Sequence, residues 1–203
     1  VWPAFWLLPS RQDGLNRNGA DNRAGQQGNN ERVLIKVPGL GTATSSSGNP
    51  LVELSIQVQS VGRSDRVCSI SVYKIEDNWS PSQVTWQSQP IPQDARVVSQ
   101  IQKKFAPGET VSLDVSDYVL DETSYNGGDG TASFLLKDDY ARGCRLTFNK
   151  SSTSLTWKLP GGATLNEGGI QSTYVDNGSP SSNFSGSNVL EMQSMSLSDT
   201  GID

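Results

Sequence analysis

The sequence predicts an all-β fold, an antiparallel β-sandwich or jelly roll with one short helix and extended terminal arms. Three observations predict it. Short runs alternate apolar and polar residues, as in LVELSIQV at residues 51–58, which is the period-two pattern of a half-buried strand. Turn-forming residues separate these runs, and the chain contains 20 glycines and 10 prolines. No run of ten residues carries the apolar spacing of a long helix.

Eight segments are predicted to be strands because each combines this alternation with β-branched or aromatic residues. They are residues 32–37, 51–58, 67–75, 95–101, 111–115, 132–137, 145–148 and 154–159. Turn sequences such as SSSGNP, VGRSD and SYNGGDG lie between them. The segment SDYVLDE at residues 116–122 predicts the short helix, with Ser116 as its N-cap.

The chain divides into three stretches. Residues 32–160 carry the strand pattern and form the predicted sandwich. Residues 1–31 begin with the apolar VWPAFWLLP and continue as a polar arm rich in Gly, Asn and Gln. Residues 161–203 begin as a linker and contain two short strand-like pieces, STYV and VLEMQSM. An isolated hairpin is marginally stable, so we expect these pieces to pair with another sheet.

The composition excludes several classes of function. The chain of 203 residues has no histidine, which excludes Ser-His-Asp triads and zinc sites with His ligands. Its net charge is −5, whereas proteins that bind nucleic acid need a basic surface. No apolar run approaches the roughly 18 residues of a membrane-spanning helix. We therefore expect neither nucleic acid nor a membrane span.

Two cysteines, Cys68 and Cys144, stand in separate alternating runs. A disulfide between those two strands would fit an extracellular or cell-surface protein, because disulfides persist in oxidising compartments. The alternative is two separate buried thiols.

The segment DNWSPSQVTWQSQP at residues 77–90 resembles the hallmark of the DNRLRE domain family. The residues in matching places are Tyr73, Trp79, Thr85, Trp86 and Pro90. ERVLIKVPGL and SLDVSDYVLDE resemble two further segments of that family, so the resemblance covers residues 31–159. It implies a non-catalytic extracellular β-sandwich found beside polysaccharide-degrading enzymes and in cell-surface proteins. Some of these domains bind acidic polysaccharides.

The opening strands of that family are missing before Arg32, and similar residues stand near the C-terminus instead. They are Tyr174, Val175, Asn183, Phe184, Leu190 and Met192. This segment could fold back onto its own domain, belong to a second, incomplete copy, or complete the sandwich of the next molecule. We expect the last of these, because strand addition to an exposed sheet edge, repeated head to tail, builds an open filament.

The apolar N-terminus is expected to take part in the same contacts. Trp2, Phe5, Trp6 and Leu8 would each gain roughly 1.5–3 kcal/mol from burial, either in their own sandwich or in a neighbour. WPAFWLLP also resembles a strand of laminarinase-like β-glucanases, but the chain lacks their Glu-x-Asp-x-x-Glu cluster. The predicted function is therefore a non-enzymatic structural subunit of an extracellular fibre. The alternative is a carbohydrate-binding module of a secreted polysaccharide-degrading enzyme or cell-surface protein.

Glycans are expected as attached groups and as ligands. Four N-x-[ST] sequons would accept N-linked glycans in a secreted eukaryotic protein: Asn78, Asn149, Asn177 and Asn183. Exposed aromatic residues could contact a bound sugar: Trp79, Trp86, Tyr125 and Tyr140. Three cations could pair with the charges of an acidic sugar: Lys103, Lys104 and Arg142. For the two tryptophans, the alternative is a role as core or loop anchors.

No cofactor or catalytic residue is expected. Asp121, Glu122 and Asp129 could supply oxygen ligands to calcium, but they lack the spacing of an EF-hand. The carboxylate pairs at residues 76–77, 121–122 and 138–139 are adjacent in sequence. Adjacent residues face opposite sides of a strand or lie in solvated turns, which does not suit glycoside hydrolysis.

Overall fold

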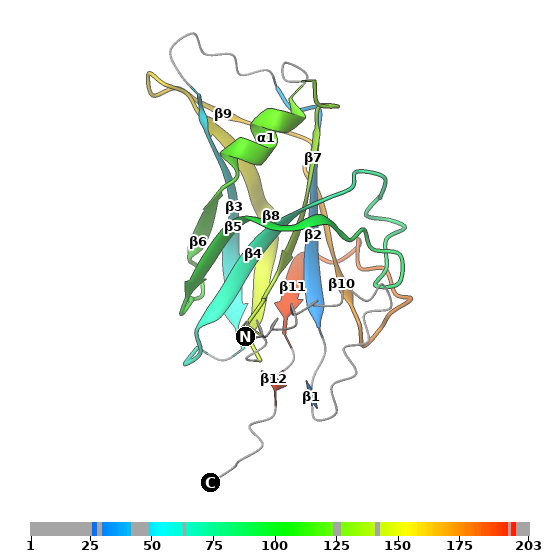
Figure 1. Cartoon of the computed structure of the whole chain (residues 1–203). Helices are drawn as coiled ribbons and strands as arrows, with labels where there is room; N and C mark the ends of the chain where they lie inside the picture. The colour runs from blue at the N-terminus through cyan, green and yellow to red at the C-terminus, as the bar shows by residue number, and fades with distance from the viewer. Residues whose placement is uncertain are drawn as a thin grey trace, which may run out of the picture.

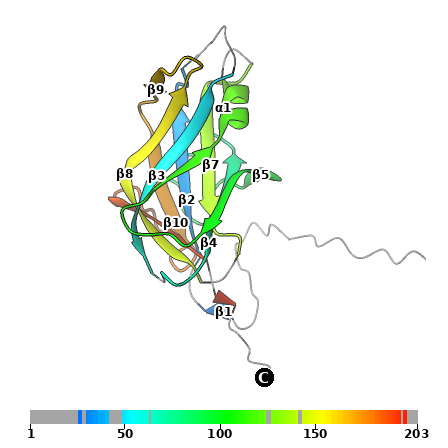
Figure 2. The ribbon, with the colours of Figure 1, turned by 90° about the vertical axis from the view of Figure 1, so that its left-hand side faces the viewer.

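Two antiparallel layers of strands pack face to face in the computed structural model of the chain (Figures 1 and 2). The structure describes residues 26–27, 30–41, 49–62, 64–123, 127–140, 143–194 and 196–197. The first layer has the strand order β10-β2-β7-β4-β5, and the second has β11-β8-β3-β6 with β9 also on β8. One residue pair between β2 and β11 joins the layers. The predicted all-β sandwich is confirmed.

The elements have the following bounds: β1 Gln26–Gln27, β2 Glu31–Pro38, β3 Leu51–Val61, β4 Cys68–Ile75, β5 Pro92–Lys103, β6 Thr110–Asp114, α1 Ser116–Glu122, β7 Thr131–Lys137, β8 Arg145–Lys158, β9 Thr164–Asn166, β10 Gln171–Asp176, β11 Val189–Gln193 and β12 Ser196–Leu197. β1 pairs only with β12. The one described helix is too short to cross a membrane.

Alternation along the strands fills the core between the layers. Val33, Ile35 and Val37 of β2 point into it from the first layer, and Leu54 and Ile56 of β3 do so from the second. All five side chains are fully buried. The same period of two places the intervening residues of β2 on the outer face of the first layer.

The two strands predicted at residues 145–148 and 154–159 form a single strand, β8, which ends at Lys158. Asn149 lies opposite Gln57 of β3, whereas Ser154 lies opposite Ser55, so β8 bulges outward between these pairs. The Oγ of Ser152 accepts a hydrogen bond of 2.9 Å from the backbone N of Gln57. The Asn-Ser-rich stretch therefore forms a bulge, which sequence alone does not distinguish from a turn.

The helix α1 has the expected bounds, but its N-cap differs. Val115 occupies that position without a side-chain hydrogen bond, and Ser116 is the first helical residue. The carboxylate of Asp114 accepts from both the backbone N (3.0 Å) and the Oγ (2.6 Å) of Ser116. The Oγ of Ser116 in turn accepts from the backbone N of Val52 and so ties the helix to β3.

The C-terminal strands lie in the sheet of their own chain. All six residues of β10 pair with β2, and all five residues of β11 pair with β8. Tyr174, Leu190 and Met192 are buried in the core, and the ring of Phe184 stacks on Tyr174 at 4.4 Å. The structure thus shows the fold-back alternative within the single chain and gives no support to the expected donation of these strands to a neighbour. Trp2, Phe5, Trp6 and Leu8 lie outside the described residues.

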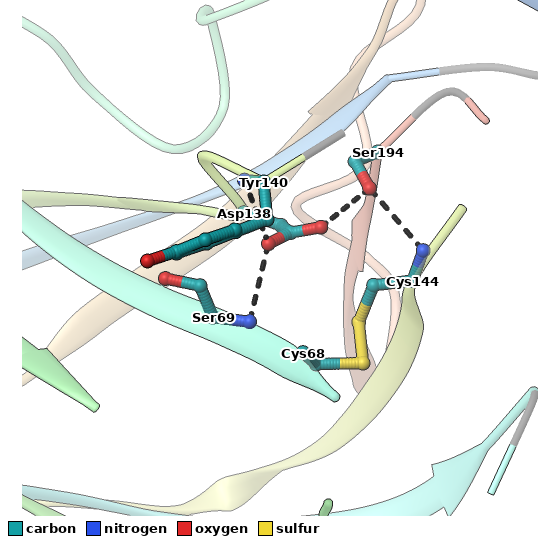
Figure 3. Close-up of a disulfide and its surroundings, with 6 residues drawn as sticks. All are labelled: Cys68, Ser69, Asp138, Tyr140, Cys144 and Ser194. Atoms are coloured by element: carbon teal, nitrogen blue, oxygen red, sulfur yellow. Dashed lines mark hydrogen bonds between the residues drawn. A yellow bond between two sulfur atoms is a disulfide. The ribbon is translucent and has the colours of Figure 1, made fainter. Parts of the chain in front are cut away.

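A disulfide joins Cys68 at the start of β4 to Cys144 just before β8, with 5.5 Å between the Cα atoms. Beside it, Asp138 accepts hydrogen bonds from the backbone N of Ser69 and the Oγ of Ser194 (Figure 3). The backbone N of Cys144 donates to the same Ser194 Oγ. The two layers are therefore linked at the first residue of β4, covalently by the disulfide and through the hydrogen bonds of Asp138 and Ser194.

Candidate functional site

The connection between β4 and β5, residues 76–91, covers the outer face of the first layer (Figure 1). A second apolar cluster lies beneath it, separate from the core between the layers. Trp79, Val84 and Trp86 of the connection pack there against strand residues such as Leu34 and Leu135. The two tryptophans are only 7% and 2% exposed. They anchor the connection to the sheet, which is the alternative role considered for them above.

Two cations of β2 hold the connection from below. The Nζ of Lys36 donates to the carbonyl oxygens of Asp77 (2.5 Å) and Trp79 (3.1 Å). The guanidinium of Arg32 lies 4.5 Å from the centre of the Trp86 ring and donates to the side-chain oxygen of Gln89 at 3.3 Å. Both charges are thus engaged underneath the connection.

A further hydrogen bond fixes the orientation of the first tryptophan. The Nε1 of Trp79 donates to the Oγ of Ser133 on β7, at 3.2 Å. A buried indole N–H needs such a partner, since an unpaired one costs free energy.

The outer side of the connection forms a hollow of about 440 Å³. Its lining is mainly amides and hydroxyls, with a few apolar side chains and one charged residue: Glu76, Asn78, Trp79, Ser80, Gln83, Val84, Gln87, Ser88, Gln89, Pro90 and Ile91. Ile91 is 37% exposed and supplies the most accessible apolar surface of this lining. We call this site the β4–β5 hollow.

The amides of the β4–β5 hollow are available to a ligand. Asn78, Gln83 and Gln87 are exposed, and their side chains make no hydrogen bond within the described part of the chain. Each amide can donate through its nitrogen and accept through its oxygen. This combination suits a ligand that carries many hydroxyl groups.

The segment between β10 and β11 braces the β4–β5 hollow from one side. The Nδ2 of Asn183 donates to the carbonyl oxygens of Pro81 (2.6 Å) and Val84 (2.7 Å). The backbone N of Gln87 donates to the carbonyl of Pro180 at 3.2 Å. Residues about 100 positions apart in the chain therefore fix the shape of one surface.

The three aromatic residues considered for sugar contact that the structure describes, Trp79, Trp86 and Tyr140, do not gather at one place. Trp79 lines the β4–β5 hollow, whereas Trp86 is buried beneath it. Tyr140 is 39% exposed and lies beside Asp138 near the disulfide, at the other end of β4 (Figure 3). Tyr125 and Arg142 lie outside the described residues.

The lysines proposed for an acidic sugar are also away from the β4–β5 hollow. Lys103 forms an ion pair with Glu109, and Lys104 is exposed beyond the end of β5. Neither residue contributes to the lining. The structure therefore does not bring these two lysines to this surface.

The four sequons differ in their surroundings. Both hydrogens of the Asn183 amide are used in its two bonds to backbone carbonyls, and a glycan would take the place of one of these hydrogens. The Oδ1 of Asn149 accepts from Ser151, and that of Asn177 accepts from the backbone N of Asn30. Asn78 is exposed in the β4–β5 hollow. Glycosylation at all four sequons stays a prediction.

The acidic residues considered for calcium have local partners. Glu122 pairs with Lys74, and Asp129 accepts from the backbone N of Thr131 at 2.8 Å. Within the described ranges, no group of three or more carboxylates or cysteines could hold a metal ion.

Three carboxylates, those of Glu31, Asp176 and Glu191, lie near Arg145 at the first residue of β2. Burial, the carboxylate of Glu191 and that of Asp176 raise the pKa of Glu31 to about 7, against the opposing effect of Arg145. Arg145 itself forms an ion pair with Glu191 at 3.0 Å. This cluster lies outside the lining of the β4–β5 hollow.

Sequence reasoning missed Gln83, Gln87 and Asn183 as site residues. The signal for the glutamines is their frequency in SQVTWQSQP, on both sides of the anchoring Trp86. Asn183 is predicted only as a sequon and as part of the displaced opening strands, and nothing in the sequence links it to residues 81–84.

The model of carbohydrate-binding module family 96 matches residues 20–159, which include the whole β4–β5 hollow but not Asn183. No curated protein matches the chain. The match supports the carbohydrate association expected for residues 31–159. It gives no support to the DNRLRE family itself or to the likeness with β-glucanases.

Proposed function

Because the chain belongs to carbohydrate-binding module family 96, we propose that it binds a polysaccharide through the β4–β5 hollow. The observation that carries this proposal is the group of exposed amides, Asn78, Gln83 and Gln87, whose side chains have no hydrogen-bond partner among the described residues. Unpaired donors and acceptors converging on a concave surface are what a binding site for a polar ligand requires.

The lining offers two kinds of contact to a sugar ring. The amides and the hydroxyls of Ser80 and Ser88 match the hydroxyl groups of a sugar, because each partner can donate and accept. Ile91 and the accessible edge of Trp79 offer apolar surface to the C–H groups of the ring. The buried part of Trp79 holds this surface in place, since its Nε1 is bonded to Ser133.

The proposed role is binding without catalysis. Carbohydrate-binding modules are non-catalytic domains, and the two carboxylates at the entrance to the connection, Glu76 and Asp77, are sequence neighbours. A glycosidase needs two carboxylates placed on either side of the scissile bond, about 5–10 Å apart. We therefore propose that the module keeps its chain on a polysaccharide surface.

An extracellular or cell-surface location goes with this role. A polysaccharide surface of the kind proposed lies outside the cell, and the Cys68–Cys144 disulfide is stable in an oxidising compartment such as the extracellular space. The family match and the disulfide are independent observations that support the same location.

Binding of the full chain to an array of purified plant, algal and microbial polysaccharides tests the proposal. We expect at least one polysaccharide to bind, and titration calorimetry with it to show at least a tenfold loss of affinity in the double variant Asn78→Ala/Gln87→Ala. Gln102→Ala is the matched control, because Gln102 is exposed at the far end of β5. Binding that survives in the double variant, or is lost equally in the control, would overturn the assignment of the site.

A further inference from the structure

We propose that Asn183 is a positioning residue for polysaccharide binding, because it helps to fix the two turns that carry the exposed glutamines of the β4–β5 hollow. The inference rests on the proposed function and extends its binding unit to a segment outside the residues that match the family. Asn183 is exposed and is not part of the lining, so it acts through the residues that it holds.

The glutamines of the hollow stand on two separate turns of the connection. The first turn, residues 80–84, carries Gln83 and closes through backbone hydrogen bonds to the carbonyl of Ser80. The second turn, residues 85–88, carries Gln87 and closes through a backbone hydrogen bond of 3.2 Å between its first and last residues. Because each turn closes on itself, these local bonds do not fix one turn relative to the other.

The segment between β10 and β11 contacts both turns (Figure 1). The Nδ2 of Asn183 donates to the carbonyl oxygens of Pro81 (2.6 Å) and Val84 (2.7 Å) in the first turn. The carbonyl of Pro180 accepts from the backbone N of Gln87, in the second turn, at 3.2 Å. One short stretch of chain therefore holds both turns, and with them the side chains that the proposed site uses.

This stretch is itself attached to the sandwich. The ring of Phe184 stacks on that of Tyr174 of β10 at 4.4 Å, and the Nζ of Lys150 of β8 donates to the carbonyl of Ser185 at 2.7 Å. The Oδ1 of Asn183 accepts from the backbone N and the Oγ of Ser185, which orients its Nδ2 toward the connection. A site that is ordered before its ligand arrives loses less conformational freedom on binding, and this raises affinity.

Titration calorimetry of the full chain tests the inference, at a temperature where every variant is folded. The probes are alginate, polygalacturonate, mixed-linkage β-glucan and galactomannan. For the probe that the natural chain binds most tightly, Asn183→Ala is expected to lose at least fivefold in affinity, because both bonds to the connection are removed. Asn188→Ala is the matched control in the same segment and should stay within twofold. Equal affinities of the two variants would overturn the inference.

An acid titration asks whether the donor hydrogens of Asn183 cause the effect. Asn183→Asp keeps the size of the side chain, but an ionised carboxylate cannot donate to the two carbonyls, so we expect at least the loss seen in Asn183→Ala at neutral pH. Protonation of the new carboxyl group near pH 4 restores one donor. The affinity of Asn183→Asp relative to the natural chain should therefore rise at least threefold between about pH 7 and pH 4. A recovery of the same size in Asn188→Asp would assign the effect to net charge and overturn the inference.

Amide hydrogen exchange separates a positioning role from a purely structural one. A polysaccharide that binds better when the two turns are in place must also favour that arrangement, because coupling between two equilibria is reciprocal. A saturating amount of the bound polymer should therefore slow the exchange of Gln83 and Val84 in Asn183→Ala at least threefold. Faster exchange in the free variant with an affinity within twofold of the natural chain would show that Asn183 has a structural role alone, and the inference would fail.

The outcomes separate the two proposals. If Asn78→Ala/Gln87→Ala lowers affinity at least tenfold while Asn183→Ala stays within twofold, the inference fails and the proposed function stands. If none of the polymers binds, or if the double variant binds as tightly as the natural chain, the proposed function fails, and the inference fails with it.

Discussion

Asn183 donates from its Nδ2 to the carbonyl oxygen of Val84 at 2.7 Å, across 99 positions of the chain. Its second amide hydrogen goes to the carbonyl of Pro81, and its Oδ1 accepts from the backbone N and Oγ of Ser185. All hydrogen-bonding groups of this side chain are therefore in use. The segment between β10 and β11, which lies beyond the matched residues 20–159, holds a connection that lies within them.

The first prediction concerns this contact. Asn183→Ala removes two hydrogen bonds to backbone carbonyls, each worth about 1 kcal/mol, so we expect the free energy of unfolding to fall by about 1–2 kcal/mol. Urea denaturation measures this change. Amide hydrogen exchange is expected to become faster at Gln83 and Val84, whose backbone N–H groups bond to Ser80 in the same connection.

The matched control for Asn183 is Asn188→Ala. Asn188 is exposed in the same segment, and its backbone carbonyl, not its side chain, bonds to Lys150. We expect a change below about 0.5 kcal/mol for this surface substitution. Equal losses in the two variants would mean that the segment does not brace the connection through Asn183.

The second prediction separates an anchoring tryptophan from an exposed aromatic residue. Trp79 is 7% exposed and packs in the cluster beneath the connection, so Trp79→Ala should cost about 3–5 kcal/mol of stability. Trp79→Phe keeps most of the apolar contact but loses the bond to Ser133 and should cost about 1–3 kcal/mol. Tyr140→Ala is the exposed comparison and should cost less stability than either Trp79 variant. Denaturation midpoints that do not fall in the order Tyr140→Ala, Trp79→Phe, Trp79→Ala, from highest to lowest, would contradict the anchoring role.

The third prediction concerns pH and Glu31. Its side chain is 7% exposed, and burial together with Glu191 and Asp176 raises its pKa to about 7 from an ordinary value of 4.5. Between these two pH values the folded state binds more protons than the unfolded state. The free energy of unfolding therefore falls as the pH rises from about 4.5 to above 7, by up to about 3 kcal/mol from this group.

Urea denaturation across this pH range checks the sign. Glu31→Gln keeps the shape of the side chain without its charge, so the decline attributed to Glu31 should disappear. Glu76→Gln, in the exposed lining of the β4–β5 hollow, should keep the decline. A decline that persists in Glu31→Gln would assign the pH dependence to other groups.

The strands could be predicted because each one shows its own alternation of apolar and polar residues. Residues 51–58 alternate without interruption, and the structure contains β3 there. The bulge of β8 was missed because Asn149, Ser151 and Ser152 are typical of turns, and the hydrogen bonds that keep them in the strand come from each other and from Gln57 of β3. Local composition does not contain those partners.

The partner of β10 could not be predicted for a related reason. The backbone edge of β2 accepts a strand with the same hydrogen bonds whether that strand comes from its own chain or from a neighbour. Here the choice follows from a short return path: β9 pairs back on β8, and only residues 167–170 separate β9 from β10. A short tether gives a high effective concentration, which favours the intramolecular pairing.

The β4–β5 hollow escaped sequence analysis because its shape depends on contacts distant in sequence. The tryptophans of residues 76–91 mark this segment in the sequence, but not which of its side chains face solvent. Which side of the segment faces solvent is decided by Lys36, Ser133 and Asn183, which reach it from three other elements.

The last prediction concerns the disulfide. Cys68 and Cys144 are 76 positions apart, and in the chain-entropy model closing such a loop stabilises the fold by about 4 kcal/mol. The double variant Cys68→Ala/Cys144→Ala should lower the free energy of unfolding by roughly that amount, as measured by urea denaturation. The natural chain in the presence of a reductant should lose a similar amount, whereas the variant should not respond to the reductant at all.

Because the disulfide and the β4–β5 hollow lie at opposite ends of β4, polysaccharide affinity at temperatures where the variant is folded should change less than twofold. A large loss of affinity in the folded variant would show instead that the disulfide shapes the binding surface through the sheet.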